Sequence, residues 1–410
     1  MEQQGISKLD LKRRNRMQIL RILKENGPTS RIDIAGKLEL TRAAVTIITT
    51  DMIEQGIIYE QCEYKNTSER APRGRKKILL DINYNYKFVL GVTIEENIIS
   101  VGLSTMSGQI LDKKNLRINE TTTDTVIFDY IEKSLKQVLS DNCLDANSVM
   151  GIGFSVHPEM YSRMKVEVVN GVPDYSQAKA FIERYTELPI VIDTSILGTA
   201  LANIDFNKEI TTDCKNVAFI QYGNDVHFLS TYLNKPVASY LNRTDFINKM
   251  IVDPDAREIC TCGRRGCVEN EITLKAQMRE IKNDFSKDKT PYLYNAANGD
   301  VNKVTGKMVI EAYKSGDKGV IAVLRRNLEL IGVLINNINL LADPHKIIIH
   351  LYYIESEIAF DKVKAGVKRI AGKEAADKLA LSIIGKQNRF LAGCAIAIRK
   401  LFFDKGGFES

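Results

Sequence analysis

Three cysteines, Cys260, Cys262 and Cys267, follow one another closely in a segment that also contains Gly263 and Gly266. Cysteine thiolates are strong zinc ligands, and spacings of this kind allow several of them to reach one tetrahedral ion. The two glycines can adopt the backbone conformations that a tight loop between the thiols requires. The segment therefore predicts a zinc site held by the three thiols.

The other cysteines form no such pattern, since they occur singly at Cys62, Cys143, Cys214 and Cys394. Isolated cysteines usually act as small apolar residues. An odd total of seven, without an N-terminal secretion signal, argues against a disulfide framework and predicts a reducing compartment. The most apolar run is interrupted by Glu and Asn residues, so we expect no membrane span and a cytoplasmic protein.

Positive charge is concentrated towards the N-terminus. Residues 1–80 contain 16 Lys and Arg residues against 10 Asp and Glu residues, whereas the rest of the chain is balanced. A basic module joined to a neutral body is typical of a protein that binds a polyanion at one end. A solvated basic face is the alternative that charge alone leaves open.

Helical periodicity within this basic region predicts a helix-turn-helix. Apolar residues recur at helical spacing over residues 11–23, and Gly27-Pro28 ends that run. Ser30 can cap a second, short helix, and Thr41 can cap a third helix that ends near Gly56. The third helix would lie in the major groove of DNA. The predicted DNA contacts of this motif are Ser30, Arg31, Thr41, Arg42, Ala43 and Thr46.

Two predicted strands after the third helix complete a winged helix-turn-helix. They cover residues 57–63 and 77–82, and the segment Arg73-Gly74-Arg75-Lys76 precedes the second strand. Arginines on both sides of a glycine resemble the core of an AT-hook, and a narrow A·T-rich minor groove attracts such side chains. We therefore predict that these four residues bind the minor groove, with an ordinary solvated wing tip as the alternative.

Strand and helix patterns alternate beyond residue 84, which predicts an α/β body. We expect strands within residues 88–104, at 149–156 and at 190–192, and helices at 125–139, 320–341, 356–370 and 390–402. A chain of 410 residues is long enough for two or three domains. The expected domains are a winged helix-turn-helix at 1–82, a first α/β lobe at 83–195 completed by a C-terminal helix at about 388–405, and a second lobe with the cysteine motif at 196–387.

This order of parts resembles the ROK family of bacterial sugar-responsive transcription factors and sugar kinases. The resemblance rests on the winged helix-turn-helix, the Gly-Arg-Lys wing, the α/β body and the Cys-x-Cys-Gly-x-x-Gly-Cys-x-Glu motif of residues 260–269. It extends over nearly the whole chain. It implies an actin-like ATPase (ribonuclease H-like) body of two lobes, double-stranded DNA as partner, and a homodimer or homotetramer on paired half-sites.

The chain departs from the kinase chemistry that the resemblance implies. The family's kinases have a glycine-rich phosphate loop where this chain has Thr93, Glu95 and Glu96, and two carboxylates would repel ATP phosphates. Their catalytic Asp aligns with Thr194, beside Asp193, and a threonine hydroxyl cannot act as a general base. We therefore expect a body that is not an enzyme and that has no catalytic residue.

The family's sugar and metal contacts are retained only in part. The segment that implies a sugar-binding carboxylate and a metal-binding imidazole aligns with residues 246–249, where Lys249 replaces the imidazole. The predicted ligand contacts are Asp193, Thr194 and Glu269. The fourth zinc ligand is left open between water, Asp253 or Asp255, and a distant histidine, and a metal-free loop of reduced thiols is the alternative.

These expectations combine into a DNA-binding transcriptional regulator. We interpret it as a repressor of carbohydrate-use genes whose non-catalytic body senses a sugar or sugar-derivative effector. Two other classes stay open: a constitutive DNA-binding regulator without an effector, and a sugar kinase joined to a DNA-binding end.

Overall fold

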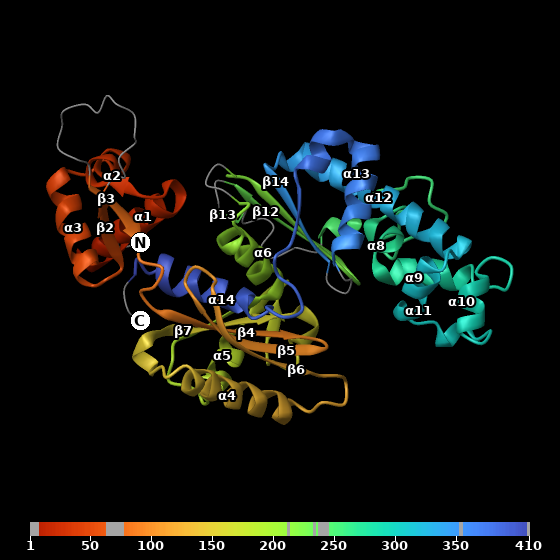
Figure 1. The fold of residues 1–410 in the computed structure, drawn as a ribbon, viewed down its shortest axis with the longest axis horizontal. Helices are drawn as coiled ribbons and strands as arrows, with labels where there is room; N and C mark the ends of the chain where they lie inside the picture. The colour runs from red at the N-terminus through yellow and green to blue at the C-terminus, as the bar shows by residue number, and fades with distance from the viewer. Residues whose placement is uncertain are drawn as a thin grey trace. The chain divides into compact units, whose positions relative to one another are not determined.

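The computed structural model describes residues 8–62, 78–210, 214–232, 235–236, 246–351 and 356–407 (Figure 1). Contacts divide the chain into two compact units. Unit 1 consists of Met1–Asp213 and Ile384–Ser410, and unit 2 consists of Cys214–Ile383. Unit 1 therefore contains both the N-terminal domain and the C-terminal segment of the chain.

The N-terminal part of unit 1 is a winged helix-turn-helix. Its elements are α1 (Lys8–Asn26), β1 (Thr29–Ser30), α2 (Arg31–Leu38), α3 (Arg42–Glu54), β2 (Ile58–Cys62) and β3 (Ile78–Ile82). The strands form an antiparallel sheet in the order β1-β3-β2. The helices bury Leu20, Ile34, Val45 and Met52. The three predicted helices and two wing strands are confirmed, and β1 is an additional strand too short to give a sequence pattern.

A five-stranded mixed sheet forms the body of unit 1. Its strands are β4 (Phe88–Glu95), β5 (Ile98–Thr105), β6 (Ile110–Arg117), β7 (Val149–Val156) and β10 (Ile190–Thr194), in the order β10-β7-β4-β5-β6. The first three in this order are parallel, and β4, β5 and β6 are joined as antiparallel neighbours. Nearly every residue of β4 and β7 is buried, as expected for strands that are covered on both faces.

Helices pack on both faces of this sheet. They are α4 (Asp124–Asp141), α5 (Ser176–Ile182), α6 (Ser195–Phe206), α14 (Leu391–Ala397) and a π-helical continuation of α14, η5 (Ile398–Phe403). Figure 1 shows α14 on one side of the sheet and α4 on the other. A Cβ added at Gly153 would lie 1.9 Å from the carbonyl oxygen of Gly393, so only glycine allows α14 to lie this close to β7. A small hairpin, β8 (Glu167–Val169) and β9 (Val172–Asp174), lies outside the sheet.

Unit 2 contains a second five-stranded sheet with the same strand pattern. Its strands are β11 (Val217–Tyr222), β12 (Val226–Tyr232), β13 (Lys235–Pro236), β14 (Lys346–Leu351) and β15 (Leu379–Leu381), in the order β13-β12-β11-β14-β15. Again three strands are parallel, and two antiparallel neighbours follow. Its helices are η3 (Phe246–Lys249), α8 (Val268–Glu271), α9 (Leu274–Asn283), α10 (Pro291–Ala296), α11 (Gly306–Lys314), α12 (Lys318–Ala342) and α13 (Ser356–Asp377). The repeated pattern agrees with the predicted α/β body of two lobes.

The boundaries of the parts differ from the expected ones. Helix α6 packs on the sheet of unit 1, so the division falls after residue 213 rather than after residue 195. The C-terminal part of unit 1 begins at Ile384 rather than at about residue 388. Among the described helices, none is long and apolar enough to span a bilayer.

Candidate nucleic-acid interface and metal-binding loop

Helix α3 has one buried and one exposed face. Val45, Ile48, Thr49 and Met52 are buried in the domain. The predicted contacts Thr41, Arg42, Ala43 and Thr46 are all exposed. Thr41 also caps the helix, because its Oγ1 accepts a hydrogen bond from the Ala44 amide at 3.2 Å. The leading turn of α3 therefore has the exposure that insertion into a major groove requires.

Ile47 is a candidate DNA contact that sequence reasoning missed. Its side chain is 72% exposed, which is unusual for an isoleucine in a helix of a folded domain. Ala43, Ile47 and Thr50 follow one another at helical spacing and are all exposed, so they share one face of α3. An apolar group on such a face can contact the methyl group of thymine. The spacing from Ala43 was the signal that could have identified Ile47.

Ser30 and Arg31 form contacts within the winged helix-turn-helix. Ser30 is 4% exposed, and its Oγ accepts a hydrogen bond from the Asp33 amide at 3.2 Å, which caps α2 as predicted. Arg31 donates from Nε to Thr49 Oγ1 at 3.0 Å, and its Nη2 lies 2.8 Å from the Glu60 carboxylate. Arg31 thus joins α2 to α3 and to the wing strand β2. The structure gives both residues a supporting role behind the exposed face of α3.

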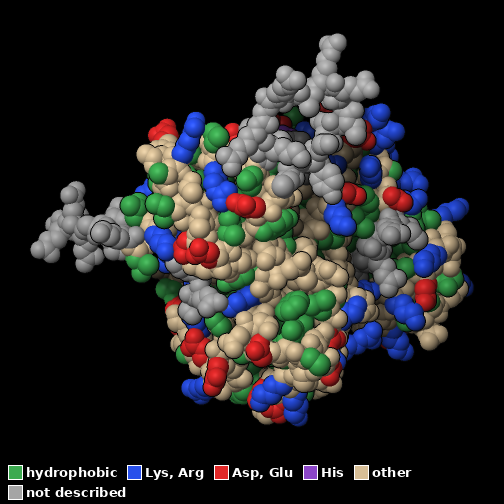
Figure 2. Space-filling model, turned by 60° about the vertical axis from the view of Figure 1, so that its left-hand side comes forward, with side chains coloured by type: hydrophobic (Ala, Val, Ile, Leu, Met, Phe, Trp, Pro, Cys, Tyr) green, Lys and Arg blue, Asp and Glu red, His purple; other side chains and the backbone are tan. Residues whose placement is uncertain are grey.

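The predicted minor-groove residues Arg73, Gly74, Arg75 and Lys76 lie outside the described residues. Their contact with DNA stays a prediction. On the face drawn in Figure 2, Lys and Arg side chains stand among Asp and Glu side chains. That face therefore carries charges of both signs.

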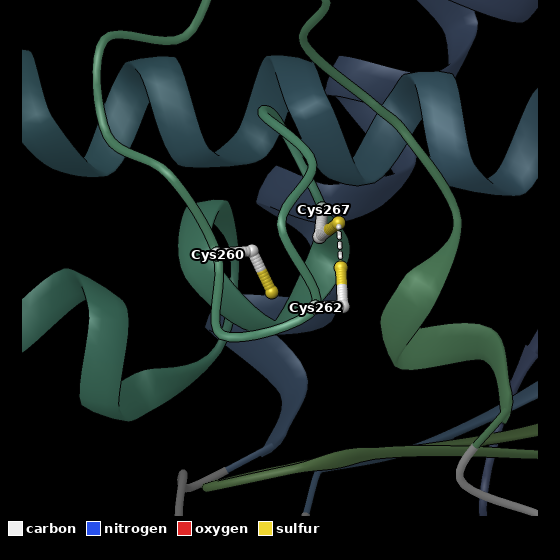
Figure 3. A group of neighbouring side chains, drawn as sticks. All are labelled: Cys260, Cys262 and Cys267. Atoms are coloured by element: carbon white, nitrogen blue, oxygen red, sulfur yellow. Dashed lines mark hydrogen bonds between the residues drawn. The ribbon is translucent and has the colours of Figure 1, made fainter.

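The loop before α8 brings the three predicted thiols together (Figure 3). The Sγ atoms of Cys260, Cys262 and Cys267 lie within 4.8 Å of one another, and those of Cys262 and Cys267 are 3.5 Å apart. Gly263 and Gly266 have φ angles of +82° and +69°, so both occupy the left-handed region that favours glycine. The three thiols thus form a group that could hold a metal ion, as their spacing predicted.

The thiols differ in how readily they become thiolates, the form that binds metal. Hydrogen bonds from the side chain and backbone of Arg264 lower the pKa of the exposed Cys262 to about 6. Burial raises the pKa of Cys267 to about 12. Cys262 therefore ionises more readily than Cys267, which would release a proton when a metal ion binds.

Neither Asp253 nor Asp255, the two carboxylates named as possible fourth ligands, belongs to the group of thiols. Among the described residues, no His, Asp or Glu atom joins the group of three thiols. Lys249 forms an ion pair with Glu269, and its hydrogen bond to the Glu269 carboxylate raises the pKa of Lys249. Asp253 Oδ2 lies 2.7 Å from Arg326 Nη2, so that carboxylate is already engaged. The donor set fits a metal with three thiolates and one position left to another ligand.

The segment that corresponds, by the family resemblance, to a kinase phosphate loop forms a tight hairpin turn. β4 and β5 remain paired up to Glu95 and Ile98, which leaves only two residues for the turn. Glu95 is 4% exposed and forms an ion pair with Arg389. Thr93 Oγ1 donates to the Arg389 carbonyl oxygen at 2.8 Å. A buried carboxylate and its guanidinium partner therefore lie at this turn, and residues 93–98 contain no glycine.

The three predicted ligand contacts belong to different units. Asp193 and Thr194 end β10 in unit 1, and Glu269 lies in α8 of unit 2. Asp193 Oδ2 lies 2.6 Å from Lys400 Nζ, and Thr194 is 8% exposed. Both carboxylates are thus paired with a lysine, Glu269 with Lys249. A sugar hydroxyl would have to compete with these ion pairs for each carboxylate.

Known proteins share this architecture. Residues 12–59 match winged helix-turn-helix DNA-binding domains, and residues 234–397 match the ROK family. The xylose repressor of Caldicellulosiruptor bescii is 22% identical over 353 residues, or 83% of each chain. A ROK family transcriptional regulator described as a homolog of the E. coli MLC protein has a TM-score of 0.66 at 18% identity, covering 96% of this chain and 97% of that one. A ROK family glucokinase from Streptomyces griseus, solved with glucose and AMPPNP, has a TM-score of 0.56 at 19% identity, covering 75% of this chain and 98% of that one.

The fold and the exposed helix define a winged helix-turn-helix protein with an actin-like α/β body of two lobes. The chain carries a ROK family domain and is homologous to the family's repressors, the xylose repressor among them. The resemblance drawn from the order of parts and the cysteine motif is thereby confirmed. The repressor-type neighbour spans nearly the whole chain, whereas the kinase covers three quarters of it.

Proposed function

We propose that this chain is a DNA-binding transcriptional regulator of the cytoplasm that represses carbohydrate-use genes in response to a sugar-like effector. The observation that carries the proposal is the exposed leading turn of α3, with Thr41, Arg42, Ala43 and Thr46 on a capped helix of a winged helix-turn-helix. Homology to a repressor named for xylose supports a sugar as the class of effector. A homodimer or homotetramer on paired half-sites completes the proposal.

The body of this regulator is proposed to be non-catalytic. A sugar kinase needs amide donors for the ATP phosphates and a general base for the sugar hydroxyl. By the family resemblance, Glu95, which pairs with Arg389, corresponds to the first position, and Thr194 corresponds to the second. A coupled assay for sugar-dependent ATP turnover by the full chain should give no signal. Turnover that Arg389→Ala or Thr194→Ala abolishes would contradict this part of the proposal.

The thiol group is proposed to bind zinc. Cys260, Cys262 and Cys267 would hold the ion, and a bound zinc would supply a structural cross-link between the two ends of the loop. Metal analysis of protein purified without chelator should find about one zinc per chain. Cys262→Ser should lower that content, whereas Cys143→Ser, which changes an isolated cysteine, should not.

Selection of DNA duplexes from a random-sequence library tests the central proposal. The full chain should enrich a defined sequence, and its affinity for that sequence should fall steeply with salt. Arg42→Ala and Thr46→Ala should each weaken binding by about 1–3 kcal/mol. Lys307→Ala, at a side chain of unit 2 that is 86% exposed, is the matched surface control. Failure to enrich any sequence over the starting library would refute the proposal.

A thermal-shift panel tests the effector. Ligands that bind the folded state raise the melting temperature by mass action. The panel should contain free sugars, phosphorylated sugars and amino sugars, and we expect at least one of them to raise the melting temperature and to change DNA affinity. A body that responds to none of them would support a constitutive regulator instead.

A further inference from the structure

Arg16, in α1, is a charged side chain with no exposed surface. Its Nε donates to the carbonyl oxygen of Gly406 at 2.8 Å. Its other two nitrogens contact the end of α3. Nη1 lies 3.2 Å from Oδ2 of Asp51, within α3, and Nη2 donates to Oε1 of Gln55, the C-cap residue of α3, at 2.8 Å. One guanidinium therefore joins the C-terminal turn, residues 404–407, to the end of the candidate recognition helix.

The C-terminal turn lies against α1 with no space for a side chain. Gly406 has a φ of +69°, and an added Cβ would lie 2.9 Å from the Arg13 carbonyl oxygen and 3.0 Å from Arg16 Cβ. Arg13 Nη2 also donates to the carbonyl oxygen of Asp404 at 3.2 Å. Turn and helix are thus in direct contact over more than one helical turn of α1.

A second polar contact holds α1 to the same C-terminal segment. Lys24 Nζ lies 2.8 Å from Asp205 Oδ1, and Arg399 Nε donates to Asp205 Oδ2 at 2.8 Å. Lys24 Nζ also lies 4.3 Å from the ring centroid of Phe403. Asp205 belongs to α6, and Arg399 and Phe403 belong to η5. The DNA-binding domain is therefore joined to two helices of the unit 1 body.

The C-terminal turn is linked to the central sheet of unit 1 through two helices. It follows η5, which continues α14, and α14 packs on β4 and β7. Breaking the hydrogen bonds of Arg16 would cost much free energy, because a buried guanidinium without partners is strongly unfavourable. A displacement of α14 that moves Gly406 would therefore move Arg16, and with it the α3 residues that Arg16 contacts.

We propose that Arg16 is a positioning residue for DNA recognition, through which the C-terminal turn sets the orientation of α3. The proposal rests on the proposed DNA-binding function. Base readout needs side chains placed accurately against base edges, whereas attraction to phosphates depends mainly on charge. Loss of the contact should therefore weaken binding to a specific sequence and leave non-specific binding nearly unchanged.

The test compares two glycine substitutions in the full chain. Gly406→Ala places a methyl group against α1, whereas Gly27→Ala has the same φ of +69° with nothing within 4 Å of the added Cβ. Both carry the same backbone strain, but only the first displaces the turn. Affinities are measured for a duplex selected by the wild-type chain and for an unselected duplex of equal length, at a temperature where circular dichroism shows each variant folded.

We expect Gly406→Ala to weaken binding to the selected duplex by about tenfold or more, since a misplaced base contact costs this much. Its affinity for the unselected duplex, and both affinities of Gly27→Ala, should change by less than about threefold. Arg16→Lys, which keeps the charge and loses the forked contacts, should reproduce the loss and is decisive if Gly406→Ala does not fold.

Two results would overturn the positioning role. One is unchanged discrimination in both Gly406→Ala and Arg16→Lys. The other is an equal loss for the selected and unselected duplexes, which would indicate a general loss of folded DNA-binding domain. A wild-type chain that selects no sequence would instead refute the proposed function, so the two failures are distinguishable.

Discussion

The carboxylate of Asp205 is the point in unit 1 where removing a single charge should have a large effect. It is 5% exposed and lies between the ammonium of Lys24 and the guanidinium of Arg399. Burial alone would raise the pKa of Asp205, but the charges of Arg399 and Lys24 outweigh it and keep that pKa lowered. Asp205→Asn preserves the shape of the side chain and removes the charge that both cations face.

The expected loss can be worked out from this burial. Removing one partner of a buried ion pair destabilises a protein by about 3–5 kcal/mol, because the remaining charge is left without compensation. Here two cations would remain, so we expect the upper part of that range. The matched control is Asp141→Asn, whose carboxylate is 46% exposed and lies 3.0 Å from Lys114. An exposed pair of this kind contributes less than about 1 kcal/mol.

Hydrogen exchange followed by mass spectrometry suits this measurement, because a chain of two units need not unfold in one step. Under conditions where exchange reports the free energy of opening, a loss of about 4–5 kcal/mol accelerates exchange about a thousandfold or more. We expect this acceleration in peptides of α1, α6 and η5 for Asp205→Asn, and less than about fivefold for Asp141→Asn. Acceleration below tenfold for Asp205→Asn, or equal acceleration in both variants, would refute the reasoning.

Three further predictions follow from other contacts. Burial lowers the pKa of Lys24 to about 8, below its unfolded value near 10.4, so the folded state binds fewer protons than the unfolded state between these pH values. Raising the pH from 7.5 to 10 should therefore increase the stability of unit 1 by about 2 kcal/mol, as measured by hydrogen exchange. The variant Lys24→Met should lack this increase. Lys249→His should tighten zinc binding about a hundredfold in a chelator competition, because it adds a fourth ligand, whereas Lys275→His in an exposed ion pair should have no effect. Gly153→Ala should destabilise unit 1 by about 3 kcal/mol through its clash with Gly393, whereas Gly36→Ala, with free space in helix α2, should stabilise its domain by about 0.5–1 kcal/mol.

Local patterns predicted the elements that depend on near neighbours in the chain. The caps at Ser30 and Thr41, the buried strand at 149–156 and the convergence of three thiols all follow from spacings of a few residues. The beginning of the first helix was less accurate, since α1 starts at Lys8, before the apolar run, whereas its end at Asn26 agrees with the predicted stop at Gly27-Pro28. Basic and polar residues continue a helix as well as apolar ones do.

Long-range partners account for what the sequence did not reveal. Arg16 belongs to a run of basic residues that charge analysis assigned to DNA or solvent, yet it is fully buried against a glycine 390 positions away. Asp205 and Glu95 likewise acquire their roles from Arg399 and Arg389, on a segment at the other end of the chain. No spacing or propensity encodes such pairs, because they depend on the path of the chain through the whole fold.

The contact between Arg16 and Gly406 also has a consequence for biosynthesis. The winged helix-turn-helix leaves the ribosome before the body, and a domain that emerges earlier can fold while translation continues. The turn that Arg16 binds is made 390 residues later, which at 5–20 residues per second is a delay of about 20–80 s. In a nascent or prematurely terminated chain, Arg16 therefore lacks its partner Gly406, and under the proposed positioning role α3 is correctly oriented only after the C-terminal turn has been made.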